Sequence, residues 1–349
     1  MAAPDLPNEI PPPVLSAWPN YSTASISPIT GGLINQTYSL TPPRGRRAIL
    51  QRLHPVFPPE TNLNIDAVTR HLSSLGLATP RLVPTNDNQL WFIHAGYCWR
   101  SLTYLDGQTY SRLTNAATGF QAGRLVGTFH RAMSGFPGQL QVFRTHVHDT
   151  PRHLARLSQA VTDHPNHPLH PKVRQQTEQV LLAAHQLPPL APGKNRICHG
   201  DLKISNLLFD ESGQGLCLID LDTLTPMPWA LEMGDALRSW CNPNREDQAN
   251  PYLDLELFEA AVTGYQSAAP GFPTPREWST LIPGLKLICL ELSARFLADA
   301  LYENYFGWDE TRYSTRGEHN LARGISMWEL YLNVAAQARD AEKILAKLV

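Results

Sequence analysis

The first hundred residues alternate short, β-rich apolar runs with glycine and proline turns. The expected strands cover residues 26–29, 33–40, 48–52, 90–93 and 98–105. The turns between them include Gly31-Gly32 and the segment at residues 42–45. Between residues 62 and 75 the apolar positions instead recur at helical spacing. We therefore expect a small antiparallel sheet that is interrupted by one helix.

After residue 106 the pattern becomes mainly helical. The expected helices begin near residue 114 and cover residues 173–185, 253–265, 285–302 and 325–348. We find no internal repeat and no low-complexity tract. Residues 1–105 are therefore predicted to form a small β-rich lobe and residues 106–349 a larger, mainly helical lobe, which together make an α+β bilobal fold. A cleft between the lobes is the expected ligand site.

The candidate chemistry lies in residues 199–206, which read His-Gly-Asp-Leu-Lys-Ile-Ser-Asn. Apolar runs on either side of the polar turn at residues 210–215 predict a β-hairpin whose open end brings Asn206 beside Asp220. An amide oxygen and a carboxylate at one place suit Mg²⁺. Asp201 could then accept the proton of a hydroxyl nucleophile while the metal neutralises phosphate charge. The alternative is a buried loop followed by acids that cap the next element. That alternative does not explain why Asp201, Asn206 and Asp220 occur in this order and at this spacing.

The spacing is that of the protein-kinase catalytic loop, His-x-Asp with Asn five residues on and a metal-binding Asp after a hairpin. The chain resembles the aminoglycoside phosphotransferase and choline kinase superfamily, which shares the protein-kinase-like fold, and within it the N-acetylhexosamine 1-kinases. The similarity is carried by residues 31–38, 49–52, 219–223, 234–238 and 295–299. It implies ATP and Mg²⁺ as cofactors and a small-molecule sugar as substrate, phosphorylated at the anomeric hydroxyl of N-acetylglucosamine or N-acetylgalactosamine.

The resemblance also implies where the nucleotide would bind. Gly31 and Gly32 lie between two expected strands, where backbone amides could cover the triphosphate, although a glycine pair in a hairpin is also simply a turn. Tyr104 and Leu105 resemble the hinge whose backbone pairs with adenine, and the alternative is an ordinary linker between lobes.

The lysine expected on the third strand is missing, and Gln51 and Arg52 stand in its place. Strand alternation sends these two side chains to opposite faces, so only one can reach the phosphates. We expect Arg52 to do so because it carries the charge; a solvated edge arginine is the alternative. Asp66, on the following helix, resembles the acid that holds the phosphate-binding cation. The alternative is that Asp66 is an exposed helical residue without such a role.

By the same resemblance, Arg295 and Tyr305 would reach the acceptor. Arg295 lies in line with an apolar helical stripe, so its charge needs a partner. The alternative to contact with the acceptor is an ion pair with Glu291 on the same helix, which would be worth only about 0.3–0.5 kcal/mol. Asp222 lies two residues after Asp220, on the same face if the segment stays extended. It could join the metal, bind a sugar hydroxyl or cap the next turn.

Two further residues are expected to support the catalytic loop. Asp235 resembles the acid that braces this loop from a helix, and such support fixes the geometry of the reacting groups. His199 braces the loop in the resemblance, and a buried histidine with satisfied hydrogen bonds is the alternative.

Composition narrows the class of protein. The 29 Lys and Arg residues against 31 Asp and Glu residues give a net charge of -2, which argues against nucleic-acid partners. The five cysteines are scattered and never spaced as C-x-x-C, so we expect reduced thiols in a cytoplasmic protein. No apolar run is long enough to span a membrane.

Six histidines lie close together between residues 146 and 170. Their spacing fits no compact metal-binding motif, and four prolines interrupt the segment. We expect a solvated stretch there.

Three functions remain open at this stage. The favoured one is an ATP- and Mg²⁺-dependent sugar 1-kinase. A second keeps the chemistry and changes the acceptor to an amino alcohol, an aminoglycoside or another sugar. The third is a nucleotide-binding pseudokinase scaffold, which the missing lysine supports and which the intact set Asp201, Asn206 and Asp220 opposes.

Overall fold

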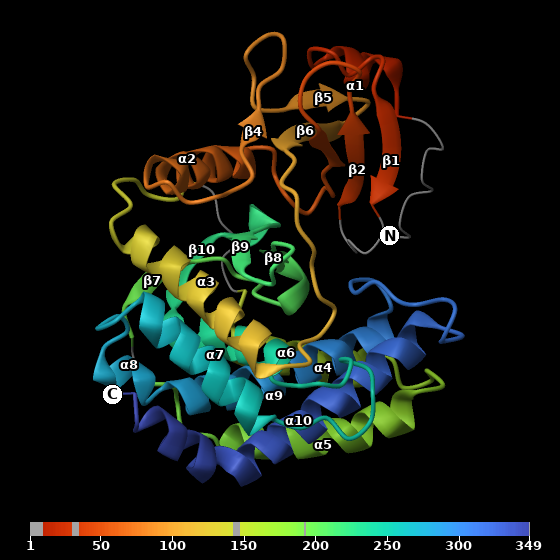
Figure 1. Ribbon diagram of the computed structural model, residues 1–349. Coiled ribbons are helices and arrows are strands. Elements are labelled where there is room, and N and C mark those ends of the chain that lie inside the picture. The colour runs from red at the N-terminus through yellow and green to blue at the C-terminus, as the bar shows by residue number, and fades with distance from the viewer. Residues whose placement is uncertain (1–9, 30–34, 142–146, 192, 349) are drawn as a thin grey trace.

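The structure is a computed structural model that describes residues 10–29, 35–141, 147–191 and 193–348. Figure 1 shows two lobes, an upper one built on a sheet and a lower one built mainly of helices. This mixed, two-lobed architecture confirms the fold expected from the sequence. The glycine pair at positions 31 and 32 lies outside the described residues.

The upper lobe contains an antiparallel sheet and two helices. Its strands are β1 (Ser25–Ile29), β2 (Gln36–Thr41), β3 (Ala48–Arg52), β4 (Leu82–Val83), β5 (Phe92–His94) and β6 (Tyr97–Thr103), and its helices are α1 (Pro12–Ser16) and α2 (Thr61–Ser74). The strand order is β1-β2-β3-β6-β4, with β5 paired to β6. The segment that begins at Ile10 covers one face, where Trp18 packs in a cluster with Leu40, Leu50 and Trp99.

Side chains of the sheet alternate between this covered face and the face toward the lower lobe. In the pairing of β3 with β6, Gln51 is opposite Arg100 and Arg52 is opposite Trp99. Arg52 therefore shares the covered face with Trp99, while Gln51 and Arg100 point toward the lower lobe. This alternation decides that Arg100, and not Arg52, faces the lower lobe.

The lower lobe is built around helices that pack on one large apolar core. They are α3 (Ala116–Ser134), α4 (Thr150–Asp163), α5 (His170–Gln186), α6 (Trp229–Trp240), α7 (Leu255–Ala268), α8 (Pro275–Trp278), α9 (Leu281–Tyr302) and α10 (Arg316–Leu345). Helix starts are encoded locally, since Asn115, Asp254 and Thr315 each cap a helix with a side-chain oxygen that accepts a backbone N–H. Among the described residues, we find no helix that combines the length and apolarity needed to cross a membrane.

The expectation of a solvated histidine-rich stretch is wrong for the described part of that segment. It folds into α4 and the start of α5, and the side chain of His148 is only 7% exposed. The prolines do not interrupt these helices because Pro151 and Pro171 sit in the first turn of each, where proline removes no intrahelical hydrogen bond.

Candidate active site

The lower lobe presents a loop held between short strands. Strand β7 (Asn195–Cys198) pairs with β10 (Thr225–Pro228), and β8 (Leu207–Phe209) pairs with β9 (Gly215–Leu218) as the expected hairpin. The backbone N–H of Ile219 donates to the carbonyl of Asn206 at 2.9 Å. The open end of the hairpin therefore brings Asn206 to the segment that carries Asp220. Figure 1 shows this unit beneath the sheet of the upper lobe.

Asp201 lies at the centre of this loop. Lys203 Nζ donates to its Oδ2 at 2.7 Å, and Asn206 Nδ2 donates to the same oxygen at 3.1 Å and to the Asp201 carbonyl at 2.9 Å. Burial disfavours the ionised carboxylate, but the charge and hydrogen bond of Lys203 prevail and lower the pKa of Asp201. The structure thus holds an ionised carboxylate, 27% exposed, between an ammonium and an amide.

Lys203 is a residue that the sequence reasoning missed. Its side chain is 39% exposed, and the nearby carboxylates of Asp201 and Asp220 offset the effect of burial and raise its pKa. It stands in the same eight-residue segment as the predicted base, so a cation within that loop was a signal available in the sequence.

Asp220 has an unusual environment. Its backbone is in the left-handed region (φ 61°), and the residue is exposed to solvent. Surrounding protein atoms and the charge of Asp222 raise its pKa to about 6, and the charge of Asp201 adds to this effect. A divalent cation would favour the ionised form. The Asn206 amide nitrogen is bonded to Asp201, which leaves its amide oxygen for another partner. An amide oxygen and the Asp220 carboxylate are ligand types that fit Mg²⁺.

The structure contradicts the expectation that Asp222 binds substrate or metal. Its side chain is fully buried, and Arg100 donates to Oδ1 at 2.5 Å and to Oδ2 at 2.7 Å. Asn35 Nδ2 also donates to Oδ2 at 2.8 Å. Both carboxylate oxygens are therefore occupied by groups of the upper lobe, and Asp222 ties the two lobes together.

Arg100, not Arg52, is the upper-lobe cation that the structure brings to this region. Arg100 Nε donates to Gln51 Oε1 at 2.9 Å, and Nη1 donates to Asn62 Oδ1 at 3.3 Å. Arg52 is 8% exposed and stacks on the Tyr97 ring at 4.4 Å, on the face covered by the N-terminal segment. The expectation for Arg52 is wrong because strand parity turns it away from the lower lobe.

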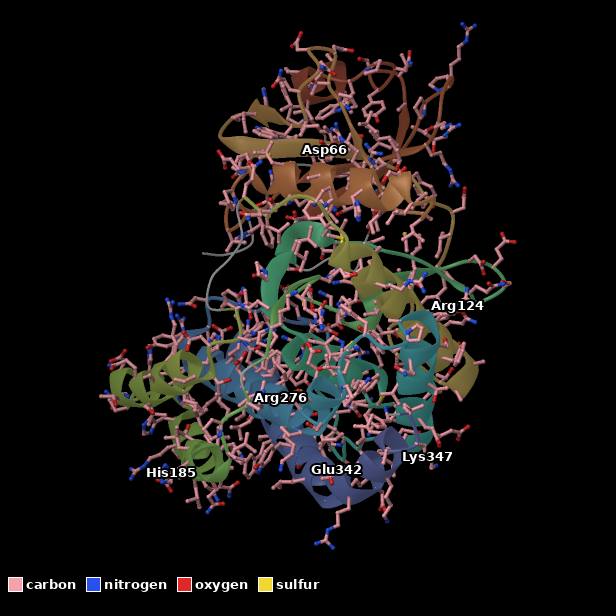
Figure 2. All side chains as sticks on the ribbon, turned by 90° about the vertical axis from the view of Figure 1, so that its left-hand side faces the viewer. Asp66, Arg124, His185, Arg276, Glu342 and Lys347 are labelled. Carbon is pink, nitrogen blue, oxygen red and sulfur yellow. The ribbon has the colours of Figure 1, made fainter. Side chains whose placement is uncertain are left out.

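Asp66 does not hold this cation either. It pairs with Arg70 one turn along α2 and lies 4.0 Å from Arg81. Figure 2 shows Asp66 on α2 in the upper lobe. The helix instead offers the neutral amide of Asn62 to Arg100, so the acid that balances the buried guanidinium comes from the lower lobe.

The brace of the catalytic loop is Glu232 on α6. The backbone N–H groups of His199 and Gly200 donate to its two carboxylate oxygens at 2.6 and 3.0 Å. Glu232 is 1% exposed, and His130 Nε2 lies 3.5 Å from it. Gly200 adopts φ +84°, and a Cβ there would lie 2.2 Å from the Thr223 carbonyl oxygen, so only glycine fits.

Asp235 was expected to brace this loop, but it pairs with Arg238, whose Nη2 donates to Oδ1 at 2.8 Å. Its charge still acts on the loop, where it contributes to the raised pKa of Lys203. His199 does link the loop to the segment that carries Asp220, because its Nε2 lies 2.8 Å from the Ile219 carbonyl.

The remaining predicted residues are Tyr104, Leu105, Arg295 and Tyr305. Tyr104 and Leu105 follow β6 where the chain leaves the upper lobe, and the Tyr104 ring lies 4.0 Å from the Arg47 guanidinium. Arg295 Nη1 lies 4.0 Å from Glu291 Oε1, which is the intrahelical alternative considered above.

Arg295 and Tyr305 meet through one aromatic ring. The Arg295 guanidinium lies 5.6 Å from the centre of the Phe306 ring, and the Tyr305 ring lies 4.8 Å from it. Arg295 on α9 and Tyr305 in the loop after it therefore both lie next to Phe306, and these three residues are called the proposed acceptor wall below.

Comparison with known proteins shows the family of the chain and the similarity of its fold. A model of the phosphotransferase enzyme family, abbreviated APH, matches residues 25–270. The aminoglycoside phosphotransferase of Alicyclobacillus acidocaldarius has a TM-score of 0.65 at 16% identity, over 98% of this chain and 99% of that one. Choline kinase of Cryptosporidium parvum has a TM-score of 0.59 at 14% identity, over 95% of each chain.

A third similar structure is an amicoumacin kinase in complex with AMP-PNP and Ca²⁺, with a TM-score of 0.56 at 16% identity, over 93% of this chain and 88% of that one. These structures share the fold at low identity, and the family model covers most of the chain. The chain belongs to the phosphotransferase enzyme family and is a small-molecule kinase that acts on an alcohol group.

Proposed function

We propose that this kinase transfers the γ-phosphoryl group of ATP, with Mg²⁺, to a sugar, at the anomeric hydroxyl of an N-acetylhexosamine. The observation that carries the proposal is the loop in which Asp201 is held by Lys203 and Asn206 beside Asp220. A nucleotide analogue and a divalent cation bound to a similarly folded kinase support the choice of cofactors. The donor ATP and five buried free thiols also favour a cytoplasmic location.

Asp201 orients the acceptor hydroxyl and accepts its proton. As the new bond forms between the acceptor oxygen and the γ-phosphorus, the bond to the β,γ-bridging oxygen breaks and ADP leaves. Lys203 lies beside Asp201 and can neutralise charge on the transferred group, and its ion pair keeps Asp201 ionised before the proton arrives. Mg²⁺ held by Asn206 and Asp220 would neutralise phosphate charge and align the leaving group.

In this proposal Arg100 is the cation that the upper lobe brings to the site. Because its guanidinium is 1% exposed and bonded to Asp222, Gln51 and Asn62, it acts by positioning Asp222 beside Asp220. It is on the face of the sheet toward the lower lobe, and the charge of Asp220 contributes to its raised pKa, so it acts within the field of the metal-binding carboxylate. Asn62 and Gln51 hold its guanidinium in place. The lysine missing from β3 is the argument for a pseudokinase, and the intact set Asp201, Asn206 and Asp220 opposes it.

A sugar acceptor is favoured over an amine by the charges near the acceptor wall. An ammonium acceptor would need a carboxylate that is not already neutralised. Among the described residues of this region, Glu291 is paired with His148, and Asp235 and Glu246 are both paired with Arg238. Arg295 adds a positive charge to the same wall. A neutral polyol fits this balance better than choline or an aminoglycoside.

The proposal is tested by supplying ATP and Mg²⁺ with a panel of acceptors. N-acetylglucosamine, N-acetylgalactosamine, glucose, choline and an aminoglycoside are compared by ADP release, and phosphorus NMR locates the phosphate on the product. Anomeric phosphate on an N-acetylhexosamine supports the proposal. Transfer to choline alone rejects the sugar and keeps the kinase, and no transfer to any alcohol rejects the reaction.

A further inference from the structure

The segment between α9 and α10, residues 303–315, carries two of the three residues of the proposed acceptor wall, Tyr305 and Phe306. We call it the α9–α10 loop. In Figure 1 it is the blue segment at the upper edge of the lower lobe, on the side of the sheet. Tyr305 is 46% exposed, so a ligand can reach it from solvent. A loop that binds a small molecule gains affinity if its backbone is already fixed, because it then loses less entropy on binding.

Asp299, in the last turn of α9, fixes the first half of this loop. Its Oδ1 accepts the backbone N–H groups of Asn304 and Tyr305 at 3.1 and 3.0 Å, and its Oδ2 accepts that of Phe306 at 2.8 Å. Asp299 is 3% exposed, and Asn320 Nδ2 on α10 also donates to Oδ2, at 2.9 Å. Hydrogen bonds to an ionised carboxylate are roughly twice as strong as neutral ones, so this residue is a firm anchor.

The anchor sets the geometry of the proposed acceptor wall. Arg295 lies one helical turn before Asp299, and its guanidinium is 5.6 Å from the centre of the Phe306 ring. The Tyr305 and Phe306 ring centres are 4.8 Å apart. Because these side chains follow their backbone, loss of the bonds to Asp299 would separate Tyr305 and Phe306 from Arg295.

Asp247, in the segment between α6 and α7, fixes the second half of the loop. Its side chain is 5% exposed, and its Oδ2 accepts from the Arg312 guanidinium and from the Tyr313 hydroxyl at 3.2 Å. His319 Nε2 on α10 lies 3.1 Å from the same oxygen, and His319 Nδ1 accepts the backbone N–H of Asp309 at 3.1 Å. Since Nδ1 accepts, the ring proton is on Nε2 and points to Asp247. The imidazole therefore ties the loop to this carboxylate.

The last turn of α6 is bonded to the catalytic loop. Ser239 Oγ accepts the backbone N–H of Ile204 at 3.2 Å, and Trp240 Nε1 donates to the Leu202 carbonyl at 2.7 Å. Trp240 is fully buried, and Leu202 follows Asp201 in the chain. The end of α6 therefore has a fixed position relative to Asp201.

Arg238, on the same turn of α6, extends this connection to the α9–α10 loop. Its Nη1 donates to Glu246 Oε1 at 2.6 Å, and Arg323 Nε on α10 lies 3.7 Å from Glu246 Oε2. Arg323 Nη1 in turn donates to the Gly307 carbonyl at 2.7 Å. A continuous series of side-chain contacts thus joins the helix that holds the catalytic loop to the middle of the α9–α10 loop, next to the proposed acceptor wall.

We propose that Asp299 is a positioning residue for the acceptor: it holds the α9–α10 loop in the arrangement that binds the acceptor beside Asp201, while Asp247 holds the far end of the same loop. The inference rests on the proposed function for the place where the acceptor binds, and it applies to any alcohol acceptor at that place. It predicts that a loosened loop weakens binding of the acceptor and leaves binding of the nucleotide unchanged.

The kinetic test uses Asp299→Asn, whose amide keeps one acceptor oxygen but turns an N–H donor toward the backbone N–H groups of the loop. With the acceptor that the panel identifies, N-acetylglucosamine under the proposed function, we expect the acceptor KM to rise about 10- to 100-fold with the KM for ATP unchanged. Asp254→Asn is the matched control, because Asp254 also accepts two backbone N–H groups, at the start of α7, and should change neither KM. An unaltered acceptor KM in Asp299→Asn overturns the inference.

Asp247→Asn acts at the other end of the loop and decides the question if Asp299→Asn does not fold. Arg312 loses its ion pair in this variant, while the bonds between Asp299 and residues 304–306 remain. We expect the same rise in the acceptor KM with the KM for ATP unchanged. In that case an unaltered acceptor KM overturns the inference.

Hydrogen exchange in the wild-type protein tests the loop without turnover. Exchange of residues 304–313 is followed by mass spectrometry with AMP-PNP and Mg²⁺ present throughout, before and after addition of N-acetylglucosamine, glucose or choline. Slower exchange with N-acetylglucosamine supports the inference. Slower exchange with choline alone keeps the inference and rejects the proposed sugar. Exchange that none of these compounds slows overturns the inference, even if one of them is phosphorylated.

Discussion

Replacement of Arg100 by methionine tests the ion pair that joins the two lobes. The Arg100 and Asp222 side chains are 1% and 0% exposed. Removal of one partner leaves the other charge buried, which costs about 3–5 kcal/mol. In a unit of about 150–250 residues each kcal/mol lowers Tm by about 2–4 °C, so we expect a fall of roughly 6–20 °C.

The double variant Arg100→Met with Asp222→Leu distinguishes two causes of lost stability, the cost of an unpaired buried charge and the loss of the contact itself. With both charges removed, apolar side chains fill the space and no carboxylate is left without its partner, so most of the lost stability should return. Thermal unfolding of the wild type, both single variants and the double variant gives the coupling between the two residues. A Tm in Arg100→Met within about 2 °C of the wild type, or a double variant as unstable as the two losses summed, would refute the reasoning.

The same four proteins separate stability from catalysis. If Arg100 also binds the phosphates, the double variant regains its Tm but not its affinity for ATP. Arg100→Lys keeps the charge and loses the two-pronged contact with Asp222, so it should recover part of the ATP affinity. Full turnover in the stable double variant would remove Arg100 from the phosphate site.

Three further predictions concern the loop and the lower lobe. Asp201→Asn should lower kcat by about 10²–10⁴-fold while ATP binding measured by titration calorimetry is unchanged. Glu232→Ala leaves two buried N–H groups without acceptors, so hydrogen exchange at His199 and Gly200 should accelerate, whereas Asp235→Asn should leave it unchanged. Burial opposes ionisation of Glu277, but its bonds with Arg196 and Thr274 lower its pKa to about 2. Because this folded-state pKa is depressed, the stabilisation by these bonds is present above pH 4.5 and disappears toward pH 2. Glu277→Gln should therefore lower the free energy of unfolding at pH 7 and flatten its decline in acid, and an unchanged decline would contradict the assignment.

The parts of the site that could be predicted from sequence are those set by short-range geometry. Asp201 and Asn206 lie five residues apart in one loop, and the short hairpin that follows brings the chain back beside Asn206 at Asp220, 14 residues later. Hydrophobic alternation and a glycine turn are sufficient to predict such a return. The two-lobed fold was predictable for the same reason, because strand patterns dominate the first hundred residues and helical patterns dominate the rest of the chain.

The cation of the upper lobe was not predictable because it depends on strand register. Gln51 and Arg100 are opposite each other only because β3 pairs with β6 in one particular register, 49 residues apart. A slip of one residue would exchange the faces and bring Arg52 toward the lower lobe. Sequence alternation shows that Gln51 and Arg52 face opposite sides, but not which side is covered by the segment around Trp18.

The choice between Glu232 and Asp235 as the brace depends on helix position. The two residues are three apart on α6 and occupy neighbouring turns of one helix. Their spacing predicts that both lie near one face of α6. The position of α6 along α9 decides which of the two carboxylates contacts the catalytic loop. Tertiary packing sets this position, and the spacing of residues along one helix does not reveal it.

The contacts of Asp222 explain how a strained turn can persist at Asp220, the proposed metal ligand. Asp220 is a non-glycine residue in the left-handed region, a conformation that costs roughly 1–2 kcal/mol. Two residues later, Asp222 is held by Arg100 on β6 and by Asn35 before β2. These upper-lobe contacts fix the end of the turn, so the orientation of Asp220 depends on the closed arrangement of the lobes. Loss of Arg100 should therefore weaken metal binding at Asp220 although Arg100 is not a ligand, which makes metal affinity a direct measure of coupling between the lobes.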